Sequence, residues 1–251
     1  MQVFVTNPRG WALSQGRADE DERFAQAATS MPAFVHASYL VNLASPDRAT
    51  TRRSVQSLRH TVRRAAQVGA RGVVVHTGSA VTKGRRRESL RQVRRLLLPV
   101  LDAVPDGCDV LLEPTAGQGE SVCSTLDELA EYLDVLGAHE RLGVCIDTCH
   151  AFAAGHDLTR RGGMKRFLDE LSGLTTAAPL RLVHGNDCVD ACGSGKDRHA
   201  AIGAGALGLP PFAALLRHPL MRGVPVVLET PDSQVPHAEQ LDVLRSLRRR
   251  G

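Results

Sequence analysis

The chain has 251 residues, of which 43% are hydrophobic and 4% aromatic, and its formal net charge is +4. No run approaches the roughly 18 apolar residues that span a bilayer, and the amino terminus lacks a signal-peptide pattern, so we expect a cytoplasmic protein without a membrane partner. The charge permits a polyanionic partner without requiring one, and the low aromatic content argues against a base-stacking surface for single strands. We predict one domain over residues 1–251, with six cysteines as reduced thiols.

Six short apolar runs each stop at a side chain that can bind a metal ion. Successive ends lie about 40 residues apart, which is the length of a strand, a crossover helix and two loops. Parallel strands with polar residues at their carboxyl ends form the catalytic face of a β/α barrel. The sequence therefore predicts an α/β fold, a TIM (β/α)8-type barrel with one shared metal site. The run ends are His36, His76, Glu113, Asp147, His184 and Glu229.

The amino-terminal part of the chain predicts a strand at Gln2–Thr6, followed by a turn that carries Arg9. After the second strand, the loop at residues 37–46 places Tyr39 next to Leu40. An exposed Tyr-Leu pair would be a wedge for a nucleic acid duplex, whereas a buried pair would only pack. The residues alone favour packing.

Apolar residues at helical spacing predict the helices between the strands. Thr125 and Glu128 have the capping-box spacing, and Gly137 follows as a helix stop. The arginine runs at residues 85–87 and 248–250 are interpreted as solvated helix faces. The predicted helices cover residues 19–29, 54–68, 90–101, 126–136, 164–171, 210–216 and 237–248.

The glycine-rich loop at residues 189–211 contains the sequence Asp197-Arg198-His199. It brings a carboxylate and an imidazole to one point, so we predict a functional loop. His150, three residues past Asp147, adds another imidazole. In the alternative interpretation, Asp147 caps the next helix and His150 is only hydrogen-bonded. The remaining histidines are predicted to lie outside the site: His60, His139, His156, His218 and His237.

Together these candidates exceed the needs of a single ion. Zinc takes about four ligands and a carboxylate can bridge two ions, so the set fits two or three zincs. The imidazoles favour zinc or another borderline metal over magnesium. Clustered divalent ions activate a water and stabilise the leaving oxygen in an in-line displacement, so phosphodiester hydrolysis is the natural chemistry. The candidate ligands are His36, His76, Glu113, Asp147, His150, His184, Asp197, His199 and Glu229.

These motifs resemble the endonuclease IV family of apurinic/apyrimidinic (AP) endonucleases. The resemblance covers the whole chain, and its motifs are specific. They are HASYLVNLASP at residues 36–46, HTGS at 76–79, EPTAGQG at 113–119, DTCHAFAAG at 147–155, Asp197-Arg198-His199 with Ile202-Gly203, and LET at 228–230.

The resemblance implies a trinuclear zinc site in a barrel. It implies that Glu113 and Glu229 are catalytic, with Glu229 helping to orient the attacking water. It also implies that Arg9, Tyr39 and Leu40 enter duplex DNA at the lesion, against the packing favoured by the residues alone. The implied ligand sets are His36, His76 and Glu113 for one zinc; Glu113, Asp147, His184 and Glu229 for a second; and His150, Asp197 and His199 for a third.

The sequence departs from the family pattern at three positions near these motifs. Pro114 stands where the family usually has Asn, Gly185 where it has a larger apolar residue, and Cys188 where serine or alanine is usual. None of these removes a ligand, so we expect effects on loop geometry and DNA binding rather than on metal binding.

The implied activity is hydrolysis of the phosphodiester 5′ of abasic sites in duplex DNA, with trimming of blocked 3′ ends, by a monomer acting in base excision repair. One alternative is a metal-dependent sugar isomerase or epimerase of the xylose isomerase-like barrels, which would need neither His76 nor the Asp197-x-His199 pair. Another is a catalytically inactive, truncated DNA-binding copy, against which the complete ligand set argues.

Seven strands are predicted where a closed barrel needs eight. The resemblance agrees, because family members carry a first strand and helix before the segment that aligns with Gln2–Thr6. The barrel in this chain is therefore expected to lack its first β/α unit: either the true start lies upstream and the chain is a fragment, or the barrel is open. An open barrel would have a weakened fold and edge strands open to pairing with another chain. All the candidate ligands lie outside the missing unit.

Overall fold

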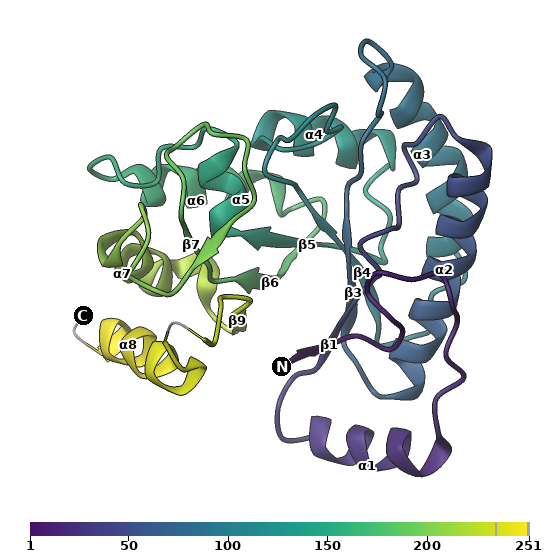
Figure 1. Cartoon of the computed structure of the whole chain (residues 1–251), viewed down its shortest axis with the longest axis horizontal. Coiled ribbons are helices and arrows are strands. Elements are labelled where there is room, and N and C mark those ends of the chain that lie inside the picture. The colour runs from purple at the N-terminus through teal and green to yellow at the C-terminus, as the bar shows by residue number, and fades with distance from the viewer. Residues whose placement is uncertain (234, 250–251) are drawn as a thin grey trace. The chain divides into compact units, whose positions relative to one another are not determined.

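The computed structural model describes residues 1–233 and 235–249, and the chain divides into two compact units. Unit 1 comprises residues 1–113, 120–122 and 131–144, and unit 2 comprises residues 114–119, 123–130 and 145–251. Strand β5 (Leu142–Asp147) passes from unit 1 into unit 2 after Val144. Figure 1 shows the elements along the chain. The single domain over residues 1–251 stays a prediction.

Unit 1 is built on parallel strands that each pair with the next strand along the chain. Apart from the two-residue β1, whose residues are only partly buried, these strands have buried Val and Leu side chains at their centres, as expected for parallel strands covered on both faces. The register places His76 opposite Glu113, so two candidate ligands are neighbours at adjacent strand ends. These strands are β1 (Gln2–Val3), β2 (Phe34–His36), β3 (Gly72–His76), β4 (Asp109–Glu113) and the first half of β5.

The helices of unit 1 are α1 (Ala18–Ala28), α2 (Arg48–Gln67) and α3 (Arg86–Leu101). Helix α2 begins six residues before its predicted start at Ser54, because the Asp47 side chain accepts a hydrogen bond from the Thr50 backbone N–H at 2.7 Å. Such a cap satisfies a donor that would otherwise have no partner in the first turn. Leu58, Val62 and Ala65 form the buried side of α2.

Unit 2 contains the second half of β5 and most of the carboxyl-terminal elements. Strand β6 (Leu180–His184) pairs in parallel with β9 (Val226–Val227). Strands β7 (Asp187–Cys188) and β8 (His199–Ala200) form an antiparallel pair that was not predicted. The helices are α5 (Thr148–Ala153), α6 (Gly163–Leu174), α7 (Leu209–Arg217) and α8 (His237–Arg249), with a 3-10 turn at Pro219–Met221.

Helix α4 (Leu126–Val135) begins with the predicted capping box. The Glu128 backbone N–H donates to Thr125 Oγ1 at 3.3 Å, and the Glu128 carboxylate accepts from the Thr125 N–H at 3.2 Å. Gly137 follows the helix with a φ of 67°, the left-handed conformation that glycine adopts at little cost. Both ends of this helix are therefore confirmed.

The parallel strands follow the order β1-β2-β3-β4-β5-β6-β9, which confirms the predicted count of seven. The two end strands are shorter than predicted: β1 stops at Val3 instead of Thr6, and β9 covers only Val226–Val227 instead of residues 224–229. Within the described residues, each of these strands has one paired neighbour instead of two. None of the described helices is long and apolar enough to cross a membrane.

Candidate metal centres

Three strand ends in unit 1 bring two imidazoles and a carboxylate together. His36 Nε2 lies 3.2 Å from Glu113 Oε2, and His76 Nε2 lies 3.4 Å from the same oxygen. His36 and Glu113 are buried, and His76 is partly exposed. The ligand atoms of all three lie close enough together to hold one metal ion.

The imidazole of His36 is oriented by a neighbouring backbone carbonyl. With Nδ1 donating to the carbonyl of Ala37 at 2.7 Å, the lone pair of His36 lies on Nε2, the nitrogen that faces Glu113. Metal-binding histidines commonly use the second ring nitrogen in this way, which fixes the tautomer and the ring orientation. The local geometry thus prepares His36 for metal binding.

Tyr39 lies beside this centre, with 47% of its surface exposed. Its ring stacks on that of His76 with centroids 5.9 Å apart. The Tyr39 N–H donates to the Pro8 carbonyl at 2.9 Å, which ties the loop to the turn carrying the exposed Arg9. The expectation that the Tyr39-Leu40 pair only packs is wrong for Tyr39, because nearly half of its surface is open to solvent.

A second cluster lies in unit 2, where α5 meets the loop that leads into β8. His150 Nε2 lies 3.1 Å from Asp197 Oδ2, and His199 Nε2 lies 3.0 Å from Asp197 Oδ1. His199 Nε2 is also 3.3 Å from Asp147 Oδ2. The group His150, Asp197 and His199 could hold one metal ion.

Both imidazoles of this cluster repeat the arrangement of His36. With Nδ1 as the donor, His150 bonds the Pro114 carbonyl at 3.1 Å and His199 bonds the Glu229 carbonyl at 3.2 Å. The Nε2 atom of His199 is buried between two carboxylate oxygens, Asp147 Oδ2 at 3.3 Å and Asp197 Oδ1 at 3.0 Å. A neutral imidazole with its lone pair facing these oxygens would be destabilised, and a bound cation would satisfy both the imidazole and the carboxylates.

The charges of this cluster depend on each other. Burial acts to lower the pKa of His199, but the carboxylates of Asp147 and Asp197 outweigh it and raise the pKa to about 11. Burial acts to raise the pKa of Asp197, but hydrogen bonds and charge from His150 and His199 hold it well below its usual range. The two carboxylates of this site therefore face positive charge on the imidazoles. A metal ion that displaces the imidazole protons can supply that positive charge instead.

Asp147 serves two purposes at the end of β5. Its Oδ1 accepts from the N–H groups of Cys149 and His150 at 2.6 and 3.1 Å, so it caps α5 as the alternative interpretation proposed. Its Oδ2 faces His199 instead. The cap and the candidate ligand role thus use different oxygens of one carboxylate.

Asn186, which was not among the predicted site residues, links two candidate ligands. Its Nδ2 donates to Asp147 Oδ2 at 2.7 Å, and its Oδ1 accepts from the Glu229 N–H at 2.8 Å. The Glu229 carboxylate in turn lies 3.2 Å from His184 Nδ1. Asn186 is completely buried, so these contacts fix the positions of both carboxylate residues. Its place two residues past a strand end is the sequence signal that could have found it.

The next residue, Asp187, holds the loop after β8. Its carboxylate accepts backbone N–H bonds from Gly203, Gly205, Leu207 and Gly208 at 2.9 to 3.2 Å. A fully buried carboxylate with this many donors is well satisfied, and it anchors the segment that continues from His199. Asp187 was also missed among the site residues.

The cysteines are free, as predicted, and Cys192 is the exposed one among those the structure describes. Cys149 lies near Asp147 and His199, but its thiol donates to the Arg198 carbonyl at 3.7 Å. A hydrogen bond with Cys188 and burial keep the pKa of Cys149 well above its usual range. Since metals bind the thiolate, the raised pKa makes Cys149 a weaker candidate ligand than the imidazoles beside it.

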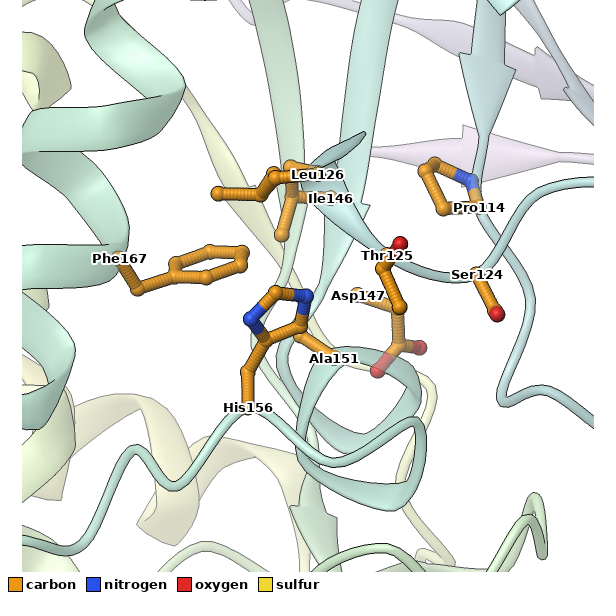
Figure 2. A pocket seen from close by; sticks show the side chains of 9 residues that line it. All are labelled: Pro114, Ser124, Thr125, Leu126, Ile146, Asp147, Ala151, His156 and Phe167. Atoms are coloured by element: carbon orange, nitrogen blue, oxygen red, sulfur yellow. The ribbon is translucent and has the colours of Figure 1, made fainter. Parts of the chain in front are cut away.

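A small pocket in unit 2 lies beside the second cluster (Figure 2). His156 lines it together with Asp147, and the His156 ring packs edge-on against Phe167 with centroids 5.0 Å apart. The pocket volume of about 10 Å³ is at the lower limit for one water molecule. It is too small for a substrate, which agrees with the prediction that His156 lies outside the site.

The structure therefore brings together the ligands predicted for the first zinc (His36, His76 and Glu113) and for the third (His150, Asp197 and His199). Of the ligands predicted for the second zinc, it brings together Asp147, His184 and Glu229. The addition of Glu113 to that second set stays a prediction. Arg9 and Tyr39 lie on neighbouring loops of unit 1, and their entry into DNA, with that of Leu40, also stays a prediction.

Comparisons with known proteins agree with this arrangement. Residues 1–249 match the family described as Xylose isomerase-like TIM barrel. Two proteins named probable endonuclease 4, from Streptomyces avermitilis and Streptomyces coelicolor, are each 51% identical over 252 residues, covering 99% of this chain and 81% and 86% of theirs. Endonuclease IV from Thermus thermophilus aligns with a TM-score of 0.82 at 33% identity, covering 100% of this chain and 89% of that chain. A D-tagatose 3-epimerase-like protein, at 19% identity and a TM-score of 0.73, shows only the common fold.

These matches define a β/α barrel of the xylose isomerase-like class, which confirms the predicted fold class. Within that class, the chain belongs to the endonuclease IV family. It is an enzyme, a hydrolase of the nuclease type, as the sequence predicted.

Proposed function

We propose that this nuclease is a zinc-dependent AP endonuclease that hydrolyses the phosphodiester 5′ of abasic sites in duplex DNA. We also propose that it trims blocked 3′ ends and acts in base excision repair as a monomer. The observation that carries the metal part is the repeated orientation of His36, His150 and His199, each with Nδ1 on a backbone carbonyl and Nε2 facing a carboxylate.

The donor set fits zinc. Zinc–nitrogen and zinc–oxygen bonds of about 2.0 to 2.2 Å in a tetrahedron place neighbouring ligand atoms roughly 3.3 Å apart. In the first and third sets, each imidazole Nε2 lies 3.0 to 3.4 Å from a carboxylate oxygen of the same set. We propose that His36, His76 and Glu113 hold one zinc and that His150, Asp197 and His199 hold another. Asp147, His184 and Glu229 would hold a further zinc, for which the sequence also suggests Glu113.

Bound zinc would supply electrophilic charge for the phosphate and make a water acidic enough to attack it. The chain itself would orient that water through the Glu229 carboxylate, whose backbone is fixed by Asn186 and whose side chain contacts His184. Tyr39, exposed beside the first metal set, and Arg9, exposed on the adjoining turn, would hold the DNA at the lesion.

The experiment is incision of a duplex that carries one tetrahydrofuran abasic analogue, without added magnesium. We expect a single cut 5′ of the analogue that leaves a 3′ hydroxyl, and no cut in the same duplex without the analogue. Prior removal of metal by a chelator should abolish incision, and zinc should restore it. Cleavage that needs magnesium and ignores the lesion would overturn the proposal.

Trimming of 3′ ends needs a separate substrate. A nicked duplex with a 3′ phosphate should release inorganic phosphate and become a primer for a DNA polymerase. If the blocked end survives under conditions in which the abasic analogue is cut, this part of the proposal fails alone. The sugar epimerase alternative rests on fold-level likeness and gains no support from the metal sets, which include His76 and Asp197.

A further inference from the structure

Two neighbouring helices of unit 1 carry an unusual excess of positive charge. Helix α2 contains no Asp or Glu, and α3 contains only Glu88. The two helices pack side by side (Figure 1). Of their nine exposed arginines, seven form what we call the arginine face: Arg48, Arg52, Arg59, Arg63, Arg87, Arg91 and Arg95. The net charge of the entire chain is only +4, so this charge is concentrated locally.

The arginines form a stripe along each helix. At 100° per residue, Arg48, Arg52, Arg59 and Arg63 lie within about 60° of each other around α2. At a rise of about 1.5 Å per residue, they extend over roughly 22 Å. One strand of B-DNA places a phosphate about every 3.4 Å along the helix axis, so this stripe could follow about six base pairs.

The guanidinium groups of this face are available for a partner. None of the seven arginines has an ion pair with any residue that the structure describes. Other arginines of the same helices differ: Arg64 forms a buried pair with Asp21, and Arg86 pairs with Glu131. The exposed positions are therefore the ones left unneutralised.

The chemistry of the face favours a phosphate backbone over a protein. Protein interfaces draw most of their binding energy from buried aromatic or apolar anchors. Among the described residues, neither α2 nor α3 exposes a large hydrophobic side chain. A surface on which guanidinium groups are the main exposed charges matches a ligand whose repeating feature is the phosphodiester.

The face begins close to the loop that we assign to lesion recognition. Helix α2 starts at Arg48, directly after the loop that carries Tyr39 and Leu40, and its arginines continue along the helix away from that loop. DNA bound at the lesion would be held at the start of α2. The remaining arginines then lie beyond the lesion contacts.

We propose that the arginine face binds the backbone of a second segment of duplex DNA, without recognising sequence or damage. This proposal rests on the proposed function, because it assumes that duplex DNA is the substrate. Holding a second segment would keep the enzyme on long DNA between lesions and raise its rate of encounter with them.

The test compares two charge-reversed variants of equal net charge. The first is Arg59→Glu, Arg63→Glu and Arg91→Glu on the arginine face, which leaves the start of α2 unchanged. The matched control changes three exposed arginines of unit 2, namely Arg222, Arg248 and Arg249, to Glu. Binding to an undamaged duplex of about 30 base pairs is measured between about 50 and 200 mM salt. Incision is measured on an abasic duplex of about 12 base pairs, chosen to be too short to reach a second surface.

For the first variant, we expect the affinity for undamaged duplex to fall on the order of tenfold or more, with a salt slope smaller by about 2 to 3. The control should change little, and both variants should incise the short abasic duplex at the wild-type rate and melt at the wild-type temperature. If both variants lost the same affinity for undamaged duplex, the effect would come from net charge alone, and the proposal would be overturned.

Two further outcomes would also overturn it. Loss of incision on the short duplex would make the face part of the lesion site. Equal competition by polyglutamate and by undamaged duplex at matched charge would point to an acidic protein instead. Failure of the proposed function looks different, because the wild-type enzyme would then not cut the abasic duplex while its binding to undamaged DNA still depended on the arginine face.

Discussion

Asn186 shows how a residue that is not a ligand controls two that are. If it is changed to alanine, Asp147 Oδ2 loses a donor and the Glu229 N–H loses its acceptor. Each buried group left without a partner costs about 1 to 3 kcal/mol, and loss of such supporting contacts typically weakens metal binding by about 10- to 100-fold. We therefore expect Asn186→Ala to purify with less zinc and to melt at a lower temperature.

Elemental analysis and thermal unfolding, with and without added zinc, check this prediction. Asn186→Asp retains an acceptor for the Glu229 N–H but places a second carboxylate beside Asp147, so it separates the two contacts. Gln56→Ala on the exposed side of α2 is the matched control. Full zinc content in Asn186→Ala would show that the amide does not position the ligands.

Glu229→Gln removes the carboxylate of Glu229 without removing its side chain. The amide retains the size of the side chain and the backbone contact with Asn186 but cannot accept a proton from water. Loss of a positioned general base typically costs about 10² to 10⁴ in rate. We expect kcat on the abasic duplex to fall by this order while DNA affinity is largely kept, measured by single-turnover incision and by equilibrium binding. A variant with a near-normal rate would contradict the assignment.

At the residue scale, the sequence reveals ligand types but not their orientation. His36, His150 and His199 could be proposed from position, because carboxyl-terminal strand ends and the loops that follow them meet on one face. Their carbonyl partners could not, since Ala37, Pro114 and Glu229 contribute backbone atoms that any residue has. Asn186 was missed because an amide is neither a preferred zinc ligand nor a catalytic acid.

Among the helices, α1 is held most weakly. It has no buried residue, and a hollow of about 320 Å³ lies between it and the segment that follows β1. Its attachment includes a pair of hydrogen bonds from the buried Arg64 to Asp21 at 2.6 and 2.7 Å. We expect Asp21→Asn to increase hydrogen exchange in residues 18–28 while exchange in β3 and β4 is unchanged.

The contact between Arg64 and Asp21 also predicts the direction in which stability changes with pH. The hydrogen bond from Arg64 holds the pKa of Asp21 below its ordinary value. A carboxylate with a lowered folded-state pKa stabilises the fold above its unfolded value, about 4, and loses that effect as the pH falls through the folded value. The free energy of unfolding should therefore differ most between wild type and Asp21→Asn at neutral pH, and this difference should vanish in acid.

The bounds of strands and helices could be predicted where the pattern of apolar residues determines them. Strands β3, β4 and β6 end at the predicted residues His76, Glu113 and His184, because their buried apolar runs stop at polar residues. The early start of α2 depends on the Asp47 cap, a local contact that the apolar pattern does not report. The β7–β8 pair joins two-residue strands across a long loop, and strands this short have no alternation to detect.

At the scale of the whole molecule, zinc content should be high and tightly held. We expect close to three zinc equivalents per chain in protein purified without added metal, because the ligands lie largely at the ends of rigid strands. Removal of the metal should lower the melting temperature, since ligand binding stabilises the folded state. Elemental analysis and thermal unfolding before and after chelation measure both. About one equivalent, together with magnesium-dependent activity, would contradict the trinuclear proposal.

The order of the seven strands could also be predicted from the sequence, because each β/α repeat places its strand beside the previous one. The lengths of β1 and β9 could not. Strand Gln2–Thr6 has the apolar pattern of a longer strand, yet it pairs only through Gln2 and Val3. Pairing depends on the neighbouring strand, and Phe34 and Val35 are the residues that β2 offers to β1.

The exposed thiol of Cys192 gives this enzyme a natural attachment point for a spectroscopic probe. The other cysteines are buried, so a maleimide fluorophore should label the folded protein once. The label would sit five residues before Asp197, on the segment between β7 and β8. Burial raises the pKa of Cys192 above its ordinary value, so labelling should proceed best at mildly alkaline pH, where more of the reactive thiolate is present. Changes in emission on addition of zinc or DNA would then report the ordering of that segment in real time, with no engineered cysteine.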